Sequence, residues 1–396
     1  MNTSTSILRG FYNVLVEGLF PGRIVWDEGT GLITGVYPEG QTGWPDGIIW
    51  QDGLGYEAYP AVIDGHVHDR FGQPHIEDRE HLQAACIEGG VGTIVTMSNT
   101  LVPFTHPDQL PERIEYWRGS PLTVRFNIGV SRKNLPVIAG LGGLNSDWLG
   151  HVKEYDASST NPSTLIDDEG TQIKAAEAIG KSGRIKLVHA EYEPWLQRNR
   201  LQIERERQLC LEDHCYIRSP EAEVEGIRRA IQICRDTQVS THFCHVSTKG
   251  GLELIADAKE AGLPITCETC PHYWRLDNTK FAKLRGRGKM NPPLRSEFEK
   301  LWVEEMIARG VVDIIATDHA PHELERKVME DYDQCPSGVP GVQTMALMVY
   351  ELKARGRITA QRFIDLTSGN AARLFGLNKG YLSAGRDADI ILINQN

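Results

Sequence analysis

The chain has 396 residues, 40% of them hydrophobic and 24% charged, a composition that can bury a large core and excludes a disordered chain. Its 42 Lys and Arg against 53 Asp and Glu give a net charge of −11 with no long basic run, so nucleic acid is not an expected partner. No stretch approaches the roughly 18 apolar residues that a membrane helix needs, and Met1–Gly18 lacks a signal-peptide pattern. We therefore expect a cytoplasmic protein with no membrane partner.

The cysteine content is typical of a reducing compartment, because eight cysteines in so long a chain are too few for a disulfide framework. Cys267 and Cys270 form a CxxC spacing. A zinc knuckle would need a second pair with matching spacing, and a haem attachment would need a histidine where Pro271 stands. We predict that these cysteines are buried and unreactive, as free cysteines usually are.

The two ends of the chain share a β pattern. Residues 1–58 contain short alternating runs broken by Gly and Pro, as in Gly31–Tyr37, and the C-terminus ends in the run Asp389–Asn394. Neither end can bury a sheet face alone. We predict that residues 1–58 and 378–396 pair into one small β domain.

Between these ends, short apolar and β-branched runs alternate with longer segments of helical period, such as 78–88, 221–237 and 252–261. The runs, in chain order, are Ala61–His68, Val91–Asn99, Leu122–Val130, Leu149–Ala157, Arg184–Glu191, Val239–Ser247, Pro264–Tyr273 and Val311–His319. Eight strands alternating with helices predict an α/β fold in which residues 59–377 form a (β/α)8 TIM barrel. A doubly wound sheet is the alternative, but no glycine-rich dinucleotide fingerprint follows the first run.

A last segment before the C-terminal run, Gln343–Phe375, is predicted to be largely helical. Gly376 follows it directly, and glycine is the residue that most often terminates a helix. We therefore expect the barrel to end in helices rather than in a further strand.

Barrel enzymes carry their catalytic groups at the carboxyl ends of the strands. Polar candidates stand at several of the predicted strand ends: His66, His68, Lys153, His189, His245 and Asp318. Residues i and i+2 of a strand share a face, so His66 and His68 both point to the barrel axis and Val67 points away from it. Imidazole and carboxylate ligands suit a divalent transition metal such as zinc. One catalytic metal with an open position cannot use so many ligands, so we predict two metals joined by a bridging hydroxide.

The chain has 13 histidines, more than the proposed metal site can use. A lone histidine is more often a satisfied polar residue than a ligand. We predict loop or surface positions for five of them: His75, His81, His106, His151 and His214.

Short segments spread along nearly the whole chain match one known family. They are Ile63–Arg70, Met97–Thr100, Val152–Lys153 with Ser158–Thr160, Val188–Glu191, Tyr216–Pro220, Cys244–Thr248, Asn291–Arg295, Ala316–His322 and Ala384–Asp389. Together these segments resemble the amidohydrolase superfamily and, within it, the dihydroorotases. The set is far more specific than any single motif in it.

The resemblance implies a ligand assignment. His66, His68 and Asp318 would hold one zinc ion, and His189 and His245 would hold the other. Asp318 would also be the catalytic residue, because in this family it moves a proton between the nucleophile and the leaving nitrogen.

The resemblance further implies that Lys153, carboxylated to a carbamate, bridges the two zinc ions together with the hydroxide. An unmodified lysine is a cation that the metals would repel, whereas a carbamate offers two acceptor oxygens. Some dihydroorotases use an aspartate in an Asp-Asp-Gly segment instead, and Asp168 is that alternative here. Glu169, inserted before Gly170, interrupts the pattern and favours Lys153.

Substrate contacts follow from the same resemblance. Dihydroorotases carry an arginine two residues after the His-x-His pair, and Arg70 stands at that place. A planar guanidinium can bind a carboxylate through two parallel hydrogen bonds. Asn99, Asn291 and His322 resemble the remaining contacts to the carboxylate and the ring amides of the substrate.

The implied activity is the reversible hydrolysis of (S)-dihydroorotate to N-carbamoyl-L-aspartate, a small-molecule reaction of de novo pyrimidine biosynthesis. An allantoinase or dihydropyrimidinase is one alternative, but its substrate has no carboxylate for Arg70 to bind. A non-catalytic dihydroorotase-like subunit is another, but such a subunit should have lost metal ligands, and all six candidates are present. The sequence leaves open whether the chain forms a homo-oligomer.

Overall fold

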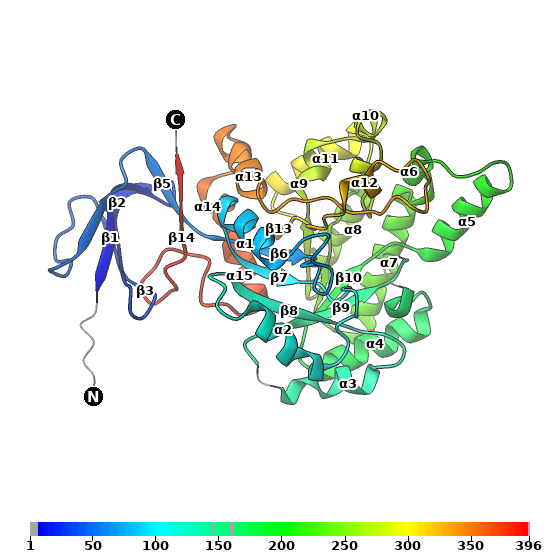
Figure 1. The fold of residues 1–396 in the computed structure, drawn as a ribbon, viewed down its shortest axis with the longest axis horizontal. Coiled ribbons are helices and arrows are strands. Elements are labelled where there is room, and N and C mark those ends of the chain that lie inside the picture. Colours follow the sequence, from blue (N-terminus) through cyan, green and yellow to red (C-terminus); the bar gives the residue numbers. More distant parts are fainter. Residues whose placement is uncertain (1–6, 145, 159–161, 395–396) are drawn as a thin grey trace.

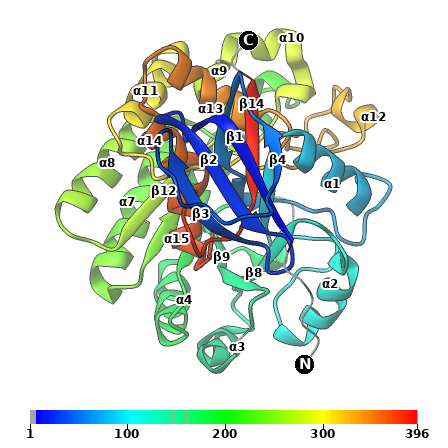
Figure 2. The same ribbon diagram turned by 90° about the vertical axis from the view of Figure 1, so that its left-hand side faces the viewer.

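The computed structural model of the protein describes residues 7–144, 146–158 and 162–394, and its strands form two sheets. One is an eight-stranded parallel sheet, and the other is a smaller mixed sheet built from both ends of the chain. Figure 1 shows the small sheet standing to one side of the barrel. Turned by 90°, the small sheet crosses in front of the barrel, and the helices surround it (Figure 2).

The small sheet has the strand order β14-β5-β1-β2-β3, with β4 paired to β1. The strands are β1 Leu8–Val16, β2 Phe20–Asp27, β3 Leu32–Pro38, β4 Ile49–Asp52, β5 Tyr56–Pro60 and β14 Ile390–Asn394. β14 runs antiparallel to β5, with Ile391 opposite Tyr59. The predicted pairing of the two chain ends is therefore confirmed. Its limits as a domain, 1–58 and 378–396, stay a proposal, and residues 1–6 and 395–396 lie outside the described ranges.

The large sheet confirms the predicted α/β barrel, because each of its strands falls on one of the predicted runs. The strands are β6 Val62–Val67, β7 Val91–Thr96, β8 Thr123–Gly129, β9 Leu149–Tyr155, β10 Lys186–His189, β11 Thr241–Phe243, β12 Ile265–Thr269 and β13 Ile314–Ile315. They pair in chain order from β6 to β13. Val67 and His319 then form a parallel bridge, and the amide of His68 donates to the His319 carbonyl at 2.8 Å, which nearly closes the barrel.

Helices fill the connections between these strands, as the βα pattern predicts (Figures 1 and 2). Those before β13 are α1 Arg79–Glu88, α2 Leu110–Trp117, α3 Leu135–Gly140, α4 Glu169–Lys181, α5 Glu193–Glu204, α6 His214–Ile217, α7 Pro220–Thr237, α8 Lys249–Glu260, α9 Pro271–Arg275, α10 Phe281–Leu284 and α11 Glu297–Ala308. After β13 come α12 Leu324–Lys327, α13 Met345–Ala354, α14 Ala360–Ile364 and α15 Asn370–Phe375. None of the helices in the described ranges has the length and apolar character that a membrane span requires.

The structure bears on two predicted boundaries, the end of the seventh strand run and the end of the last helical segment. The run Pro264–Tyr273 is wrong at its end, since β12 stops at Thr269 and α9 begins at Pro271. Proline lacks an N–H and has a fixed φ, which suits the first position of a helix better than a strand. The prediction of a largely helical segment ending at Gly376 is confirmed, and Gly376 caps α15 with a left-handed φ of 63°.

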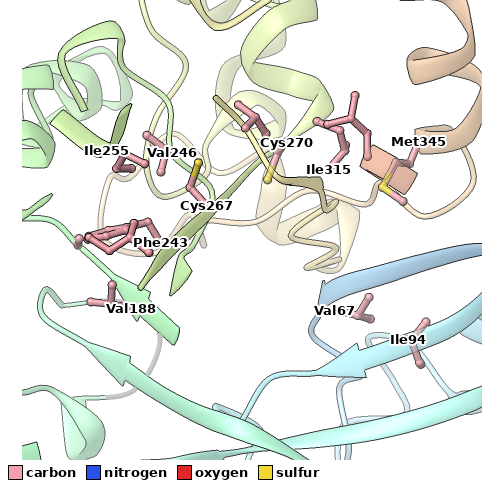
Figure 3. Close-up of a cluster of buried hydrophobic side chains, with 14 of the residues drawn as sticks. Val67, Ile94, Val188, Phe243, Val246, Ile255, Cys267, Cys270, Ile315 and Met345 are labelled. Carbon is pink, nitrogen blue, oxygen red and sulfur yellow. The ribbon is translucent and has the colours of Figure 1, made fainter. Parts of the chain in front are cut away.

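The core lies mainly between the barrel and its helices. Outward-facing strand residues such as Val67 and Phe243 belong to one large buried cluster, together with Ile255 of α8 (Figure 3). A separate, small cluster fills the inside of the barrel: Met97, Leu187 and Cys244. Strand positions thus alternate between the two sides, and the inward positions at the carboxyl ends are left for polar side chains. Cys267 and Cys270 are unbridged and fully buried, as predicted.

Candidate metal centre

The first group of ligand candidates gathers where β6 and β13 end. The Nε2 atoms of His66 and His68 lie 3.3 and 3.0 Å from Asp318 Oδ1. One ligand atom from each of the three residues lies within 4.8 Å of the other two. At most 12% of any of these side chains is exposed. The two-residue spacing brings both imidazoles to the inner face, so the three groups can contact one cation.

The second group comes from β10 and from the loop after β11. His189 Nδ1 and His245 Nε2 are 3.0 Å apart, and their ring centroids are separated by 4.6 Å. The centroid of His245 is also 5.2 Å from that of His66. The two groups are therefore neighbours within one site, although the first comes from the first and last strands of the barrel and the second from strands between them.

Two buried carboxylates orient the imidazoles. Glu268 Oε1 lies 2.5 Å from His66 Nδ1, and Glu191 Oε2 lies 2.7 Å from His189 Nε2. A carboxylate beside one ring nitrogen holds the proton there and leaves the other nitrogen as a ligand. His66 then presents Nε2 and His189 presents Nδ1, and these atoms face Asp318 and His245.

Burial keeps most of these imidazoles neutral. It lowers the pKa of His68 to about 4 and that of His245 well below its usual value, and the neighbouring His189 adds to the effect on His245. Burial also lowers the pKa of His189. Neutral imidazoles offer lone pairs, and these are what a divalent transition metal binds.

His66 and Asp318 differ from this pattern. Burial pushes the pKa of His66 down, but the charges of Glu268 and Asp318 outweigh it and raise that pKa to about 10. Burial also opposes ionisation of Asp318, yet the cationic His66 and the hydrogen bond from His68 bring its pKa to about 2. A positive charge is thus stabilised between Glu268 and Asp318. The donor set fits a metal, because a divalent cation supplies positive charge at the same atoms.

Lys153 lies in the same site. Its side chain is fully buried, and its Nζ donates to Cys244 Sγ at 3.0 Å. Among the described residues, no carboxylate lies within 4.0 Å of this Nζ. The charge of Lys153 contributes to lowering the pKa values of His189 and His245, so it lies close to both. A buried lysine without a carboxylate partner is uncommon, and carboxylation would remove its positive charge.

The alternative bridge, Asp168, lies elsewhere. It caps α4, accepting from the Thr171 amide at 2.9 Å, and it pairs with Arg132. Its side chain is 49% exposed. Local capping and a surface ion pair account for Asp168, and the structure does not bring it to the histidines. The segment Ser158–Thr160, which follows Lys153 in the resemblance, is described only at Ser158.

The backbone at the site is strained. Arg70, His245 and Asp318 have positive φ angles of 49°, 38° and 49°. Residues other than glycine seldom adopt this region, and they concentrate at functional sites when they do. The strain indicates that the surrounding structure fixes these three side chains in place.

A pocket opens over the two ligand groups. It is lined by His66, His68, Arg70, Asn99, Tyr155, His189, His245, Asn291, Asp318, Ala320, Ser337 and Gly338. Most of the predicted site residues therefore share one cavity. Of the others, Lys153 contacts Cys244, the residue before His245, and His322 contacts Arg70.

Arg70 is the cation in the pocket wall. Its Nε donates to the Pro321 carbonyl at 2.9 Å, and its Nη2 lies 3.1 Å from His322 Nε2. Burial lowers the pKa of Arg70 to about 10, so it is still charged at neutral pH. Asn291 also faces the cavity, and its Oδ1 is buried with no hydrogen-bond partner in the described chain. The wall thus offers the Arg70 guanidinium and the unsatisfied amide oxygen of Asn291 to a ligand.

Known proteins resemble this chain throughout. A sequence model described as "Amidohydrolase family" matches residues 217–396. A dihydroorotase of Halobacterium salinarum is 33% identical over 355 residues, which are 88% of this chain and 80% of the relative. The chain belongs to the amidohydrolase family.

Other proteins similar to this chain are named for different activities. An allantoinase of Salmonella newport is 28% identical over 361 residues, covering 86% of this chain and 77% of the relative. The solved structure of the L-hydantoinase from Arthrobacter aurescens superposes with a TM-score of 0.86 at 23% identity, over 97% of this chain and 86% of that one. The protein is thus an amidohydrolase of the cyclic amide branch, and its buried histidine and aspartate groups are consistent with the metal centre of such an enzyme.

Several residues of this amidohydrolase site were missed by sequence reasoning. Tyr155 lies two residues after Lys153 on β9, so the alternation of the strand could have placed it in the pocket. Glu268 stands in the middle of a buried strand, where a charge is a signal of function. Ser337 and Gly338 come from a loop without a helix or strand pattern, and sequence reasoning did not assign them to the site.

The prediction of loop or surface positions for five other histidines is partly wrong. His75, His81 and His106 are exposed, as predicted. His214, however, is 1% exposed, and its Nε2 donates to the Met290 carbonyl at 2.9 Å. His151 is half-buried, and its Nε2 donates to the Leu374 carbonyl at 2.7 Å. Both rings are satisfied by backbone carbonyls from distant segments, which the sequence does not reveal.

Proposed function

We propose that this amidohydrolase is a dihydroorotase, which interconverts (S)-dihydroorotate and N-carbamoyl-L-aspartate in pyrimidine biosynthesis. The observation that carries the proposal is Arg70, a buried cation in the wall of the pocket that contains Asp318 and the histidines. Dihydroorotate bears a carboxylate on its ring, whereas allantoin and dihydrouracil do not. The 33% identity to a dihydroorotase supports the same choice.

Two zinc ions are part of the proposal. His66, His68 and Asp318 would hold one and His189 and His245 the other, with carboxylated Lys153 between them. When bound, such ions lower the pKa of a water molecule and polarise the carbonyl that it attacks. The retention of all these residues argues against a non-catalytic subunit.

The residues of the chain perform the remaining steps. In hydrolysis, the attacking water forms a C–O bond to the ring carbonyl carbon and gives a proton to Asp318. Asp318 passes this proton to the ring nitrogen as the C–N bond breaks, which leaves a second carboxylate and a ureido group. Ring closure is the reverse sequence.

Binding and orientation come from the other side of the pocket. Arg70 would bind the ring carboxylate, with His322 held beside its guanidinium. Asn99 and Asn291 would contact the remaining polar groups, and Asn291 Oδ1 is suited to accept from a ring N–H. Fixing the ring by these contacts places its carbonyl at the attacking water.

A substrate panel tests the proposal. The purified protein is assayed with dihydroorotate, allantoin and dihydrouracil, and its zinc content is measured. We expect about two zinc ions per chain and the highest kcat/KM for dihydroorotate. A preference for allantoin or dihydrouracil would assign the protein to another cyclic amidase, and no activity together with no metal would mean a non-catalytic subunit.

A further inference from the structure

One loop contributes to the pocket without belonging to any helix or strand. Residues 328–338 follow α12 and bring Ser337 and Gly338 to the pocket wall. Gly338 has a φ of 140°, and a Cβ there would lie 2.4 Å from the Ala320 carbonyl oxygen. The loop therefore approaches the segment after β13 more closely than a larger residue would allow.

Two buried lysines hold this loop by its carbonyl groups. Lys289 Nζ donates to the carbonyls of Tyr332 and Cys335 at 2.5 and 2.7 Å. Lys327 Nζ donates to the carbonyl of Pro336 at 2.9 Å and to that of Lys289 at 2.9 Å. The second bond joins the two lysines into one unit, which spans the loop.

These lysines are unusual because they lack acidic partners. Lys289 is 5% exposed and Lys327 is 6% exposed, and no carboxylate of the described chain lies within 4.0 Å of either Nζ. Buried lysines are ordinarily paired with an acid. Burial lowers the pKa of each to about 8, so keeping them inside has a cost that the carbonyls only partly offset.

The loop leads directly to the carboxylate-binding side of the pocket. The Ser337 carbonyl lies 2.9 Å from His322 Nε2, the same atom that Arg70 Nη2 approaches to 3.1 Å. The Gly338 amide donates to the Lys289 carbonyl at 2.9 Å, which fixes the residue next to Ser337. Because a carbonyl can only accept, Nε2 donates its proton to Ser337, and the His322 ring lies against the Arg70 guanidinium; a shift of the loop would move this ring and change the surroundings of Arg70.

We propose that Lys289 and Lys327 are positioning residues for substrate specificity, which hold the 328–338 loop so that His322 and Arg70 can bind the carboxylate of the substrate. This inference rests on the proposed function, because it assumes that Arg70 binds that carboxylate. Neither lysine touches the reacting atoms. Their loss should weaken recognition of the carboxylate and leave the metals unchanged.

A pair of open-chain ligands isolates this effect. N-carbamoyl-aspartate and N-carbamoyl-β-alanine differ only in the carboxylate assigned to Arg70. Their dissociation constants are measured by calorimetry on the zinc-loaded protein and on the variants Lys289→Met and Lys327→Met. We expect N-carbamoyl-aspartate to bind about tenfold more weakly to each variant, the size of one lost hydrogen bond, with no change for N-carbamoyl-β-alanine and no change in zinc content.

Lys379→Met is the matched control. Lys379 is also buried, at 8% exposure, but its Nζ donates to Thr123 and pairs with Asp389, and neither residue belongs to the 328–338 loop. It should change stability without changing either dissociation constant. Should Lys289→Met fail to fold, Lys289→Gln keeps one donor toward the loop carbonyls and is measured in the same way.

The outcomes separate the two proposals. Equal binding of the two ligands by the parent protein would overturn the proposed function, and the inference with it. Discrimination by the parent that persists unchanged in the lysine variants would overturn the inference alone. Weakening of both ligands to the same extent would assign the lysines a general structural role and would also overturn it.

Discussion

Strand β9 carries buried charges on both of its faces, and the charges on the two faces differ in whether they have an oppositely charged partner. Lys153 points into the barrel, where no carboxylate of the described chain pairs with it. Glu154 points outward and forms an ion pair with Lys186 at 2.7 Å, with both side chains at most 1% exposed. Asp156 lies on the same outer side, and burial together with the charge of Glu154 raises its pKa well above the usual range.

The contrast separates structural from chemical charges. Removing one member of a buried ion pair leaves the other uncompensated, so such a pair is retained for stability once it exists. Stability does not explain an unpaired buried lysine among neutral imidazoles, so Lys153 is a candidate for a chemical role. Variants on the two faces of β9 should therefore affect different properties.

The inner face should give the largest effect. Lys153→Ala is expected to lose most of the bound zinc. Its kcat should fall by about a hundredfold or more, because the bridging anion and the metal chemistry are lost together. Metal analysis and kcat measure this. Short carboxylic acids, which can replace a carbamate, should restore part of the activity. Retention of two zinc ions by this variant would contradict the assignment of Lys153.

The outer face should change stability instead. Lys186→Met leaves Glu154 buried without its partner and should lower the free energy of unfolding by about 3–5 kcal/mol. Denaturant titration measures the loss, and zinc content should stay unchanged. The double variant Glu154→Gln with Lys186→Met is the control and should recover much of the stability. A loss below about 1 kcal/mol would show that the pair is not needed.

Arg70 provides a third case, a buried cation that donates to the Pro321 carbonyl and lies beside His322. Arg70→Met should lower kcat/KM for dihydroorotate by about tenfold to a hundredfold, since a charge-assisted contact contributes about 1.5–3 kcal/mol. The zinc ligands His66 and His68 lie on the preceding strand, so the metal content should not change. Dihydrouracil, which has no carboxylate, is the matched substrate and should react equally slowly with parent and variant. An unchanged kcat/KM for dihydroorotate would refute the role of Arg70.

Sequence patterns predicted the barrel because its strands are short apolar runs of regular spacing, and the two-residue spacing of His66 and His68 placed both on one face. They did not predict Glu268, because its contact with His66 joins residues 202 positions apart, and no local pattern records such a pair. Likewise, nothing in the sequence distinguishes Lys289 from an ordinary surface lysine, whereas in the structure its Nζ donates to two loop carbonyls. Periodicity predicts which face a side chain occupies, whereas its partners depend on tertiary packing.

The smallest expected effect concerns Asp168, which the sequence offered as the alternative bridge to Lys153. The structure shows a capping contact to the Thr171 amide at 2.9 Å and an exposed ion pair with Arg132. Loss of a helix cap costs about 1 kcal/mol, and an exposed ion pair adds little. Asp168→Ala should therefore lower the free energy of unfolding by about 1 kcal/mol, with zinc content and kcat unchanged. If this variant lost its zinc while Lys153→Ala kept it, the aspartate would be the bridge. The inner face of β9 would then carry no residue of the metal centre.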